Sequence, residues 1–139
     1  MSAYAYNQYK NTAVETASPG KLLLMLYDAA IRNLDKAQQA MLEKDIPTSH
    51  KNLIKTQDII KEFMCTLNMD YEISKNLFSL YEYMLQQLVQ ANVKKDPELV
   101  AEVRGYLTDL RETWQTALRG STATMPAAMS EGISRTVNV

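Results

Sequence analysis

The feature of this sequence that most constrains its fold is a repeat of apolar residues at alternating steps of four and three. The repeat occurs in four segments, which we expect to be helices at about residues 18–44, 49–67, 71–93 and 97–119. No strand pattern competes with it. Because short connections favour antiparallel neighbours, the sequence predicts an all-α fold, an antiparallel up-down four-helix bundle.

One face of each predicted helix carries the apolar positions that should form the core. In the first two helices they are Leu23, Tyr27, Ala30, Leu34, Ala37 and Met41, then Leu53, Ile60, Phe63, Met64 and Leu67. In the last two they are Ile73, Leu77, Tyr81, Met84, Leu88 and Ala91, then Leu99, Val103, Leu107, Leu110, Trp114 and Ala117.

Capping residues mark the expected helix starts. Ser18 can accept hydrogen bonds from first-turn amides, and Pro19 suits the first helical position. Pro47 disfavours helical geometry at the residue before it. The expected caps of the later helices are therefore Thr48 or Ser49, then Asp70, and Asp96 followed by Pro97.

The two ends of the chain lack this periodicity. Residues 1–17 place Tyr4, Tyr6 and Tyr9 among small and polar residues, and residues 120–139 are small and polar. We expect a flexible N-terminal arm, one folded domain over residues 18–119, and a flexible C-terminal tail.

Composition narrows the functional class. The 139 residues carry a net charge of -1 with no basic cluster, which argues against a nucleic-acid partner. The longest apolar run is far below the roughly 18 residues of a membrane span, and "MSAYAYNQYK" has no signal-peptide pattern. The single cysteine, Cys65, allows no intrachain disulfide. These features predict a cytoplasmic protein that does not insert into membranes.

The sequence offers little for catalysis. A carboxylate-bridged metal bundle needs Glu-x-x-His pairs, and His50 is the only histidine. We interpret His50 as a solvated surface residue and Cys65 as a buried or half-buried, inert thiol. No phosphate-binding loop, nucleophile elbow or paired cysteine motif is present. We therefore expect neither an enzyme nor a cofactor.

Two helices carry more apolar residues than one face needs. Tyr71, Phe78, Leu85 and Val89 lie roughly 80 to 120° round from Leu77 and form a second stripe, at about 100° per residue. The run "LLLML" at residues 22–26 is apolar nearly all round its helix. Either these residues pack against both neighbouring helices, or some of them form exposed grooves for a partner's amphipathic helix.

Three stretches resemble the FliS family of flagellar export chaperones. They are "VETASPGKLLLMLYDAAIRNLDKA", "KTQDIIKEFMCTLN" and "NLFSLYEYMLQQLVQANVKKDPELVAEVRGYLTDLRETW", and the match runs from about Tyr9 to Trp114. The resemblance implies a cytoplasmic helical bundle without catalytic activity. It also implies two partners, the C-terminal segment of flagellin and the cytoplasmic domain of the export gate protein FlhA.

The resemblance also suggests site residues. Motif matches carry over Leu24, Tyr27 and Ile31 from "LLLMLYDAAI", and Tyr81, Tyr83 and Asn92 from "LYEYMLQQLVQAN". Together with the second stripe, these are the candidate flagellin-binding residues. Asn92 could equally cap a helix, and the Tyr81 ring is expected in the core. Ala29 stands where many relatives have Gly.

The family's N-terminal segment can cover the surface on which flagellin lies, so Tyr4, Tyr6 and Tyr9 are expected to cover the groove. A rival hypothesis is that the second stripes join copies of this chain into a structural homo-oligomer. With the chaperone interpretation, the expected state is a monomer or a weak dimer.

Overall fold

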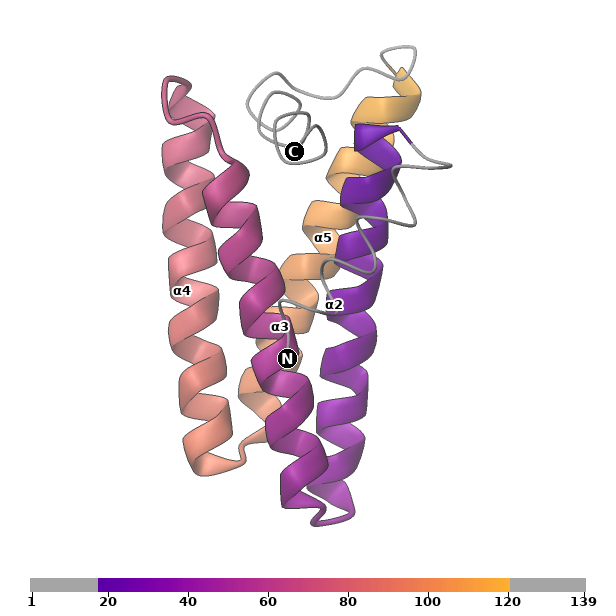
Figure 1. Cartoon of the computed structure of the whole chain (residues 1–139), viewed down its shortest axis with the longest axis vertical. Helices are drawn as coiled ribbons and strands as arrows, with labels where there is room; N and C mark the ends of the chain where they lie inside the picture. Colours follow the sequence, from indigo (N-terminus) through magenta and orange to yellow (C-terminus); the bar gives the residue numbers. More distant parts are fainter. Residues whose placement is uncertain (1–17, 121–139) are drawn as a thin grey trace.

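The computed structural model describes residues 18–120, which form four helices. They are α2 (Pro19–Leu42), α3 (Ile46–Thr66), α4 (Glu72–Lys94) and α5 (Pro97–Gly120). The prediction of an all-α four-helix bundle is confirmed. Figure 1 shows the chain reversing direction at each connection, which is compatible with the expected up-down order. The predicted arm with Tyr4, Tyr6 and Tyr9, and the tail beyond Gly120, lie outside the described residues.

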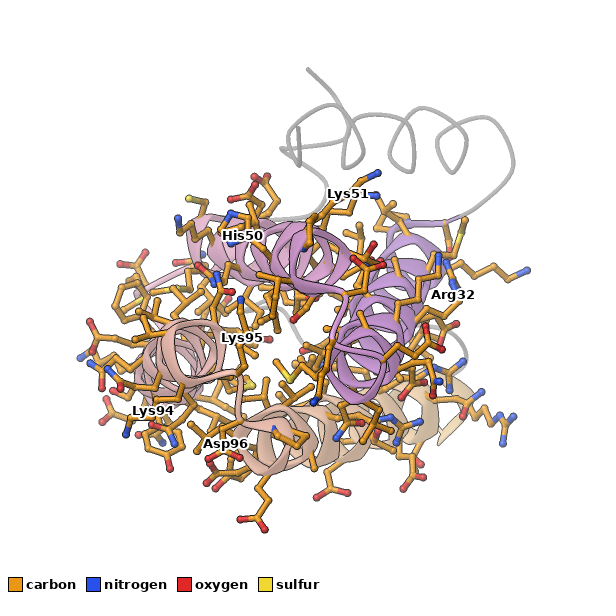
Figure 2. The ribbon with its side chains drawn as sticks, turned by 90° about the horizontal axis from the view of Figure 1, so that it is seen from below. Arg32, His50, Lys51, Lys94, Lys95 and Asp96 are labelled. Atoms are coloured by element: carbon orange, nitrogen blue, oxygen red, sulfur yellow. The ribbon has the colours of Figure 1, made fainter. Side chains whose placement is uncertain are left out.

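The helices form a ring in which each packs mainly against two neighbours. α2 packs against α3 and α5, and α4 packs against the same two helices from the opposite side. Figure 2 looks along the bundle and shows the four helices around one central space that side chains fill. A groove on the outside of this ring therefore lies between helices that are consecutive in the chain, or between α2 and α5.

Most of the predicted core positions are buried. Leu23, Tyr27, Leu53, Phe63, Tyr81, Met84, Leu88 and Leu107 are inaccessible to solvent. Five positions that we expected in the core are only half-buried, namely Met41, Met64, Leu99, Leu110 and Ala117. They lie at the edges of the buried faces or in outer turns of the helices, where a neighbouring helix covers only one side.

The predicted start of α3 was wrong by one turn. Asp45, and not Thr48 or Ser49, caps the helix, because its carboxylate accepts a hydrogen bond from the Thr48 amide at 3.2 Å. Pro47 is tolerated in the first turn because the first amides of a helix have no intrahelical acceptor to lose.

Two predictions at the start of α4 were also wrong. The cap is Tyr71, not Asp70, and no side chain completes it. Ile73 is 53% exposed, whereas Ser74 is buried in its place. The two residues lie four and three positions before Leu77, about 40° and 60° from it on opposite sides, so periodicity alone does not separate them.

Cys65 is exposed, which corrects the expectation of a buried or half-buried thiol. It follows the buried Phe63 by two residues, which is about 200° around a helix, so its side chain lies on the opposite face. His50 is exposed as expected.

Candidate functional site

A groove between α3 and α4 is the clearest candidate for a partner-binding surface. It encloses about 620 Å³. Gln57, Lys61 and Met64 line it from α3, and Glu82, Leu85, Gln86, Gln87, Val89 and Gln90 line it from α4. The α3 residues are spaced by four and three positions, so one face of that helix borders the groove along two turns.

The groove combines apolar surface with uncharged polar edges. Met64 and Leu85 are half-buried and Val89 is 46% exposed, so all three offer apolar surface to a ligand. The lining carries one positive and one negative side chain, Lys61 and Glu82. Such a surface fits an amphipathic helix better than it fits an ion or a strongly charged peptide.

Only half of the predicted second stripe of α4 lies at this groove. Leu85 and Val89 line it. Phe78 is half-buried and packs against the core, and Tyr71 is 38% exposed at the start of the helix. The stripe is therefore partly core and partly free surface, as both interpretations of the sequence allowed.

Tyr27 and Tyr81 lie in the core and present no ring surface to a groove. Their hydroxyl oxygens are 2.5 Å apart, and the Trp114 indole N–H donates to the Tyr27 hydroxyl at 3.1 Å. Phe63 stacks on Tyr27 with ring centroids 4.5 Å apart. The cluster takes one residue from each helix: hydrogen bonds join α2, α4 and α5, and the stacked Phe63 ring adds α3.

The surroundings of these two tyrosines change their acidity. Burial raises the pKa of Tyr27 to about 12, against the opposite effect of its hydrogen bonds with Tyr81 and Trp114. Burial also raises the pKa of Tyr81 well above its usual value. Both hydroxyls therefore stay protonated at neutral pH, where they serve as hydrogen-bonding groups of the core.

Tyr83 lies away from the α3–α4 groove, on the side of α4 that faces α5. Its hydroxyl donates to the Glu102 carboxylate at 2.8 Å, and its ring meets Tyr106 edge-on. The hydrogen bond to Glu102 raises the pKa of Tyr83. Because Tyr83 is 39% exposed, it remains accessible to a partner that extends onto this second face.

Asn92 does not cap α4, which ends at Lys94 with Lys95 as the left-handed cap residue. Instead, the side-chain amide of Asn92 lies 2.8 Å from the His50 ring nitrogen Nδ1 of α3, and its carbonyl accepts from the Lys95 ammonium. Figure 2 shows His50 and Lys95 at the end of the bundle where α3 begins and α4 ends. Asn92 therefore ties these two helices together below the groove.

Leu24 and Ile31 are half-buried on α2 and pack against the core. They share a helical face with Asp28 and Asp35, whose carboxylates bind Arg111 and Arg104 of α5 at 2.5 and 2.6 Å. Leu24 and Ile31 therefore lie at the α2–α5 boundary, on the opposite side of the bundle from the α3–α4 groove.

Sequence reasoning missed the α3 side of the groove. Gln57, Lys61 and Met64 recur at helical spacing, but two of them are polar and therefore form no apolar stripe. The spacing was the only available signal, because polar residues at these steps usually mark a solvated face.

Other kinds of site find little support in residues 18–120. This part of the chain contains no group of three or more His, Cys, Asp or Glu residues that could hold a metal ion. Within the same range, the helices are too short or too polar to cross a membrane.

Comparison with known proteins adds the family. A family model described as flagellar protein FliS matches residues 1–121. The chain is 43% identical to the flagellar secretion chaperone FliS of Bacillus subtilis over 114 residues, which cover 82% of this chain and 86% of that protein. It is 35% identical to the protein of the same name from Vibrio cholerae, over 76% of this chain and 82% of that protein. It is 34% identical to the one from Salmonella typhimurium, over 83% of this chain and 87% of that protein. The family match covers all four helices of the bundle, and this chain therefore belongs to the FliS family of flagellar secretion chaperones.

Proposed function

We propose that this chain is a cytoplasmic export chaperone that binds the C-terminal segment of flagellin along the α3–α4 groove. The observation that carries the proposal is the apolar surface of Met64, Leu85 and Val89, left open in a protein whose relatives are named flagellar secretion chaperones. Holding the segment there would prevent premature polymerisation. Delivery to the cytoplasmic domain of FlhA completes the proposed role.

The chemistry of the groove supports an amphipathic helical ligand. In a filament, flagellin's terminal segment forms apolar helices, so a chaperone must supply apolar surface in their place. A segment that folds as it binds typically buries about 1,000 to 3,000 Å². The groove spans only part of such a contact. We infer that the segment continues toward the start of α4, over the exposed Tyr71 of the same stripe.

Tyr4, Tyr6 and Tyr9 enter this proposal as a competing cover for the groove. An intramolecular competitor lowers the apparent affinity for a ligand in proportion to the time that it occupies the site. Deleting residues 2–16 should therefore tighten flagellin binding and leave the free energy of unfolding nearly unchanged. Weaker binding after the deletion would mean that the arm belongs to the site itself.

Paired substitutions on one face of α4 test the location of the groove. Val89→Glu places a carboxylate in the groove lining, whereas Val93→Glu, one turn further on, places it on a residue that is 76% exposed and outside that lining. We expect Val89→Glu to weaken binding of a flagellin C-terminal peptide at least about tenfold in calorimetric titration, because an unpaired charge would be buried.

Val93→Glu serves as the control and should weaken binding much less. Both variants should keep the helical circular dichroism of the parent, since neither residue is buried. Equal effects at both positions would remove the α3–α4 groove from the proposed site. Sedimentation of the free protein as a stable dimer that Val89→Glu dissociates would favour the homo-oligomer instead.

A further inference from the structure

Gln57 stands out among the residues that line the α3–α4 groove. It is only 7% exposed, so it is more deeply buried than Met64 or Val89. It nevertheless lines the groove. Within residues 18–120 its carboxamide forms no hydrogen bond.

Two neighbouring polar side chains on α3 are satisfied by their own helix. The Asn52 amide donates to the Thr48 carbonyl at 2.9 Å, and the Thr56 hydroxyl donates to the Asn52 carbonyl at 3.0 Å. On α4, the Gln87 amide donates to the Glu102 carboxylate at 3.0 Å. Gln57 differs from all three, because its two donors and its acceptor are left for whatever enters the groove.

We propose that Gln57 is a specificity-determining residue that hydrogen-bonds an uncharged carboxamide or hydroxyl side chain of the bound segment. A carboxamide can both donate to and accept from another carboxamide or a hydroxyl, so either group satisfies it. The main chain of a helical ligand is already hydrogen-bonded internally, so the partner group must come from a side chain. This inference rests on the proposed function of the groove.

The charges at the groove explain why the partner group should be neutral. Lys61 and Glu82 both line it, so an incoming charge meets one attractive and one repulsive group. A charged side chain would lose hydration without a net electrostatic return. The expected ligand therefore carries apolar residues toward Met64, Leu85 and Val89, with one Asn, Gln, Ser or Thr directed at Gln57.

Gln57→Met tests this role because it keeps the length of the side chain and removes its hydrogen-bonding groups. We expect affinity for a flagellin C-terminal peptide to fall at least about fivefold, since the peptide's polar group would be buried without a partner. The unfolding midpoint of the free protein should stay the same or rise, because an unpartnered amide has been removed. Loss of affinity and retained stability together would separate ligand recognition from a structural role.

Gln90→Met is the matched control, since Gln90 lines the same groove but is exposed to water. It should leave affinity unchanged or slightly improve it. A scan that replaces each Asn, Gln, Ser and Thr of the peptide with Ala should find one position whose loss costs affinity with Gln57 but not with Met at position 57.

The outcomes distinguish this inference from the proposed function. If Val89→Glu disrupts binding but Gln57→Met binds as tightly as the parent or more tightly, the groove holds the segment and the role of Gln57 is refuted. A scan without any position coupled to Gln57 would refute it as well. If the unmodified protein does not bind the peptide, the proposed function fails, and the inference fails with it.

Discussion

Both α2 and α4 carry more apolar residues than one core face needs, in the run at residues 22–26 and in the second stripe of α4. The two sets look alike in the sequence but have different surroundings in the fold. In α2, Leu22, Leu23 and Leu26 are 1% exposed or less, and Leu24 and Met25 of the same run are half-buried. In α4, Leu85 is half-buried and Val89 is 46% exposed. A wide apolar face therefore predicts burial only where the neighbouring helices approach closely on both sides.

Close approach around α2 has visible causes. A methyl group added at Gly20 would lie 2.7 Å from the Leu118 side chain of α5, so the absence of a side chain at Gly20 gives Leu118 the room to pack there. Further along, Asp28 and Asp35 bind Arg111 and Arg104 across the same boundary. α4 packs less extensively on its neighbours, and its boundary with α3 leaves the groove open.

The largest expected effect on stability comes from truncating a buried leucine of α2. Leu26→Ala should lower the free energy of unfolding by about 2 to 5 kcal/mol, because it leaves a cavity in a closely packed core. Val89→Ala should lower it by less than about 1 kcal/mol, because its side chain is half in solvent. Urea denaturation of both variants measures the difference. Similar losses at the two positions would break the comparison between α2 and α4.

A pH series sharpens the comparison through the tyrosines of these helices. The pKa of Tyr27 is about 12 in the folded protein, against about 10 in an unfolded chain. Between these values the unfolded chain releases a proton that the folded protein retains, so stability falls as pH rises. The loss from Tyr27 alone should reach roughly 2 kcal/mol by about pH 12.

Denaturant unfolding measured from about pH 9 upward tests this slope. Tyr27→Phe should flatten it, while Tyr83→Phe should change it much less, because Tyr83 remains exposed on the surface of α4. A slope that Tyr27→Phe leaves unaltered would mean that its hydroxyl is not held in the core.

At neutral pH, Tyr27→Phe should cost about 1 to 3 kcal/mol, because it leaves the Tyr81 hydroxyl and the Trp114 indole N–H buried without their partner. Tyr83→Phe loses a solvent-exposed hydrogen bond to Glu102 and should cost markedly less. Thermal unfolding of the two variants ranks them. The reverse order would contradict the assignment of Tyr27 to the core and Tyr83 to the surface.

The smallest expected effect is a gain. Gly105 of α5 is exposed, and a methyl group added there would meet no atom within 4 Å. Gly105→Ala should therefore raise the free energy of unfolding by about 0.5 to 1 kcal/mol, through helix propensity alone. Chemical denaturation measures this gain. A loss of stability would show that the outer face of α5 is more crowded than the open surface of α4.

Much of this fold could be predicted because helix periodicity and proline positions are local signals. The seam residues Leu23, Tyr27, Phe63 and Leu88 and the start at Pro97 follow from them directly. What could not be predicted depends on neighbours. Periodicity does not decide whether Ile73 or Ser74 turns inward, since both lie beside the seam.

The candidate site was harder to predict than the fold for the same reason. Val89 and Leu85 were recognisable as surplus apolar residues, but Tyr83 and Ile31 look similar in sequence and lie on other faces. Gln57 gave no signal, because a glutamine is expected at the surface and only the packing of α4 against α3 buries it.

The most direct test of the central claim is a photo-crosslinking measurement with the flagellin C-terminal segment. A photoreactive phenylalanine analogue placed at Val89 should crosslink to the segment, because residue 89 lines the groove. The same analogue at Gly105, exposed on α5 with no neighbouring side chain, should not crosslink. Crosslinking at position 105 without crosslinking at position 89 would contradict the account and place the bound segment on a different face of the bundle.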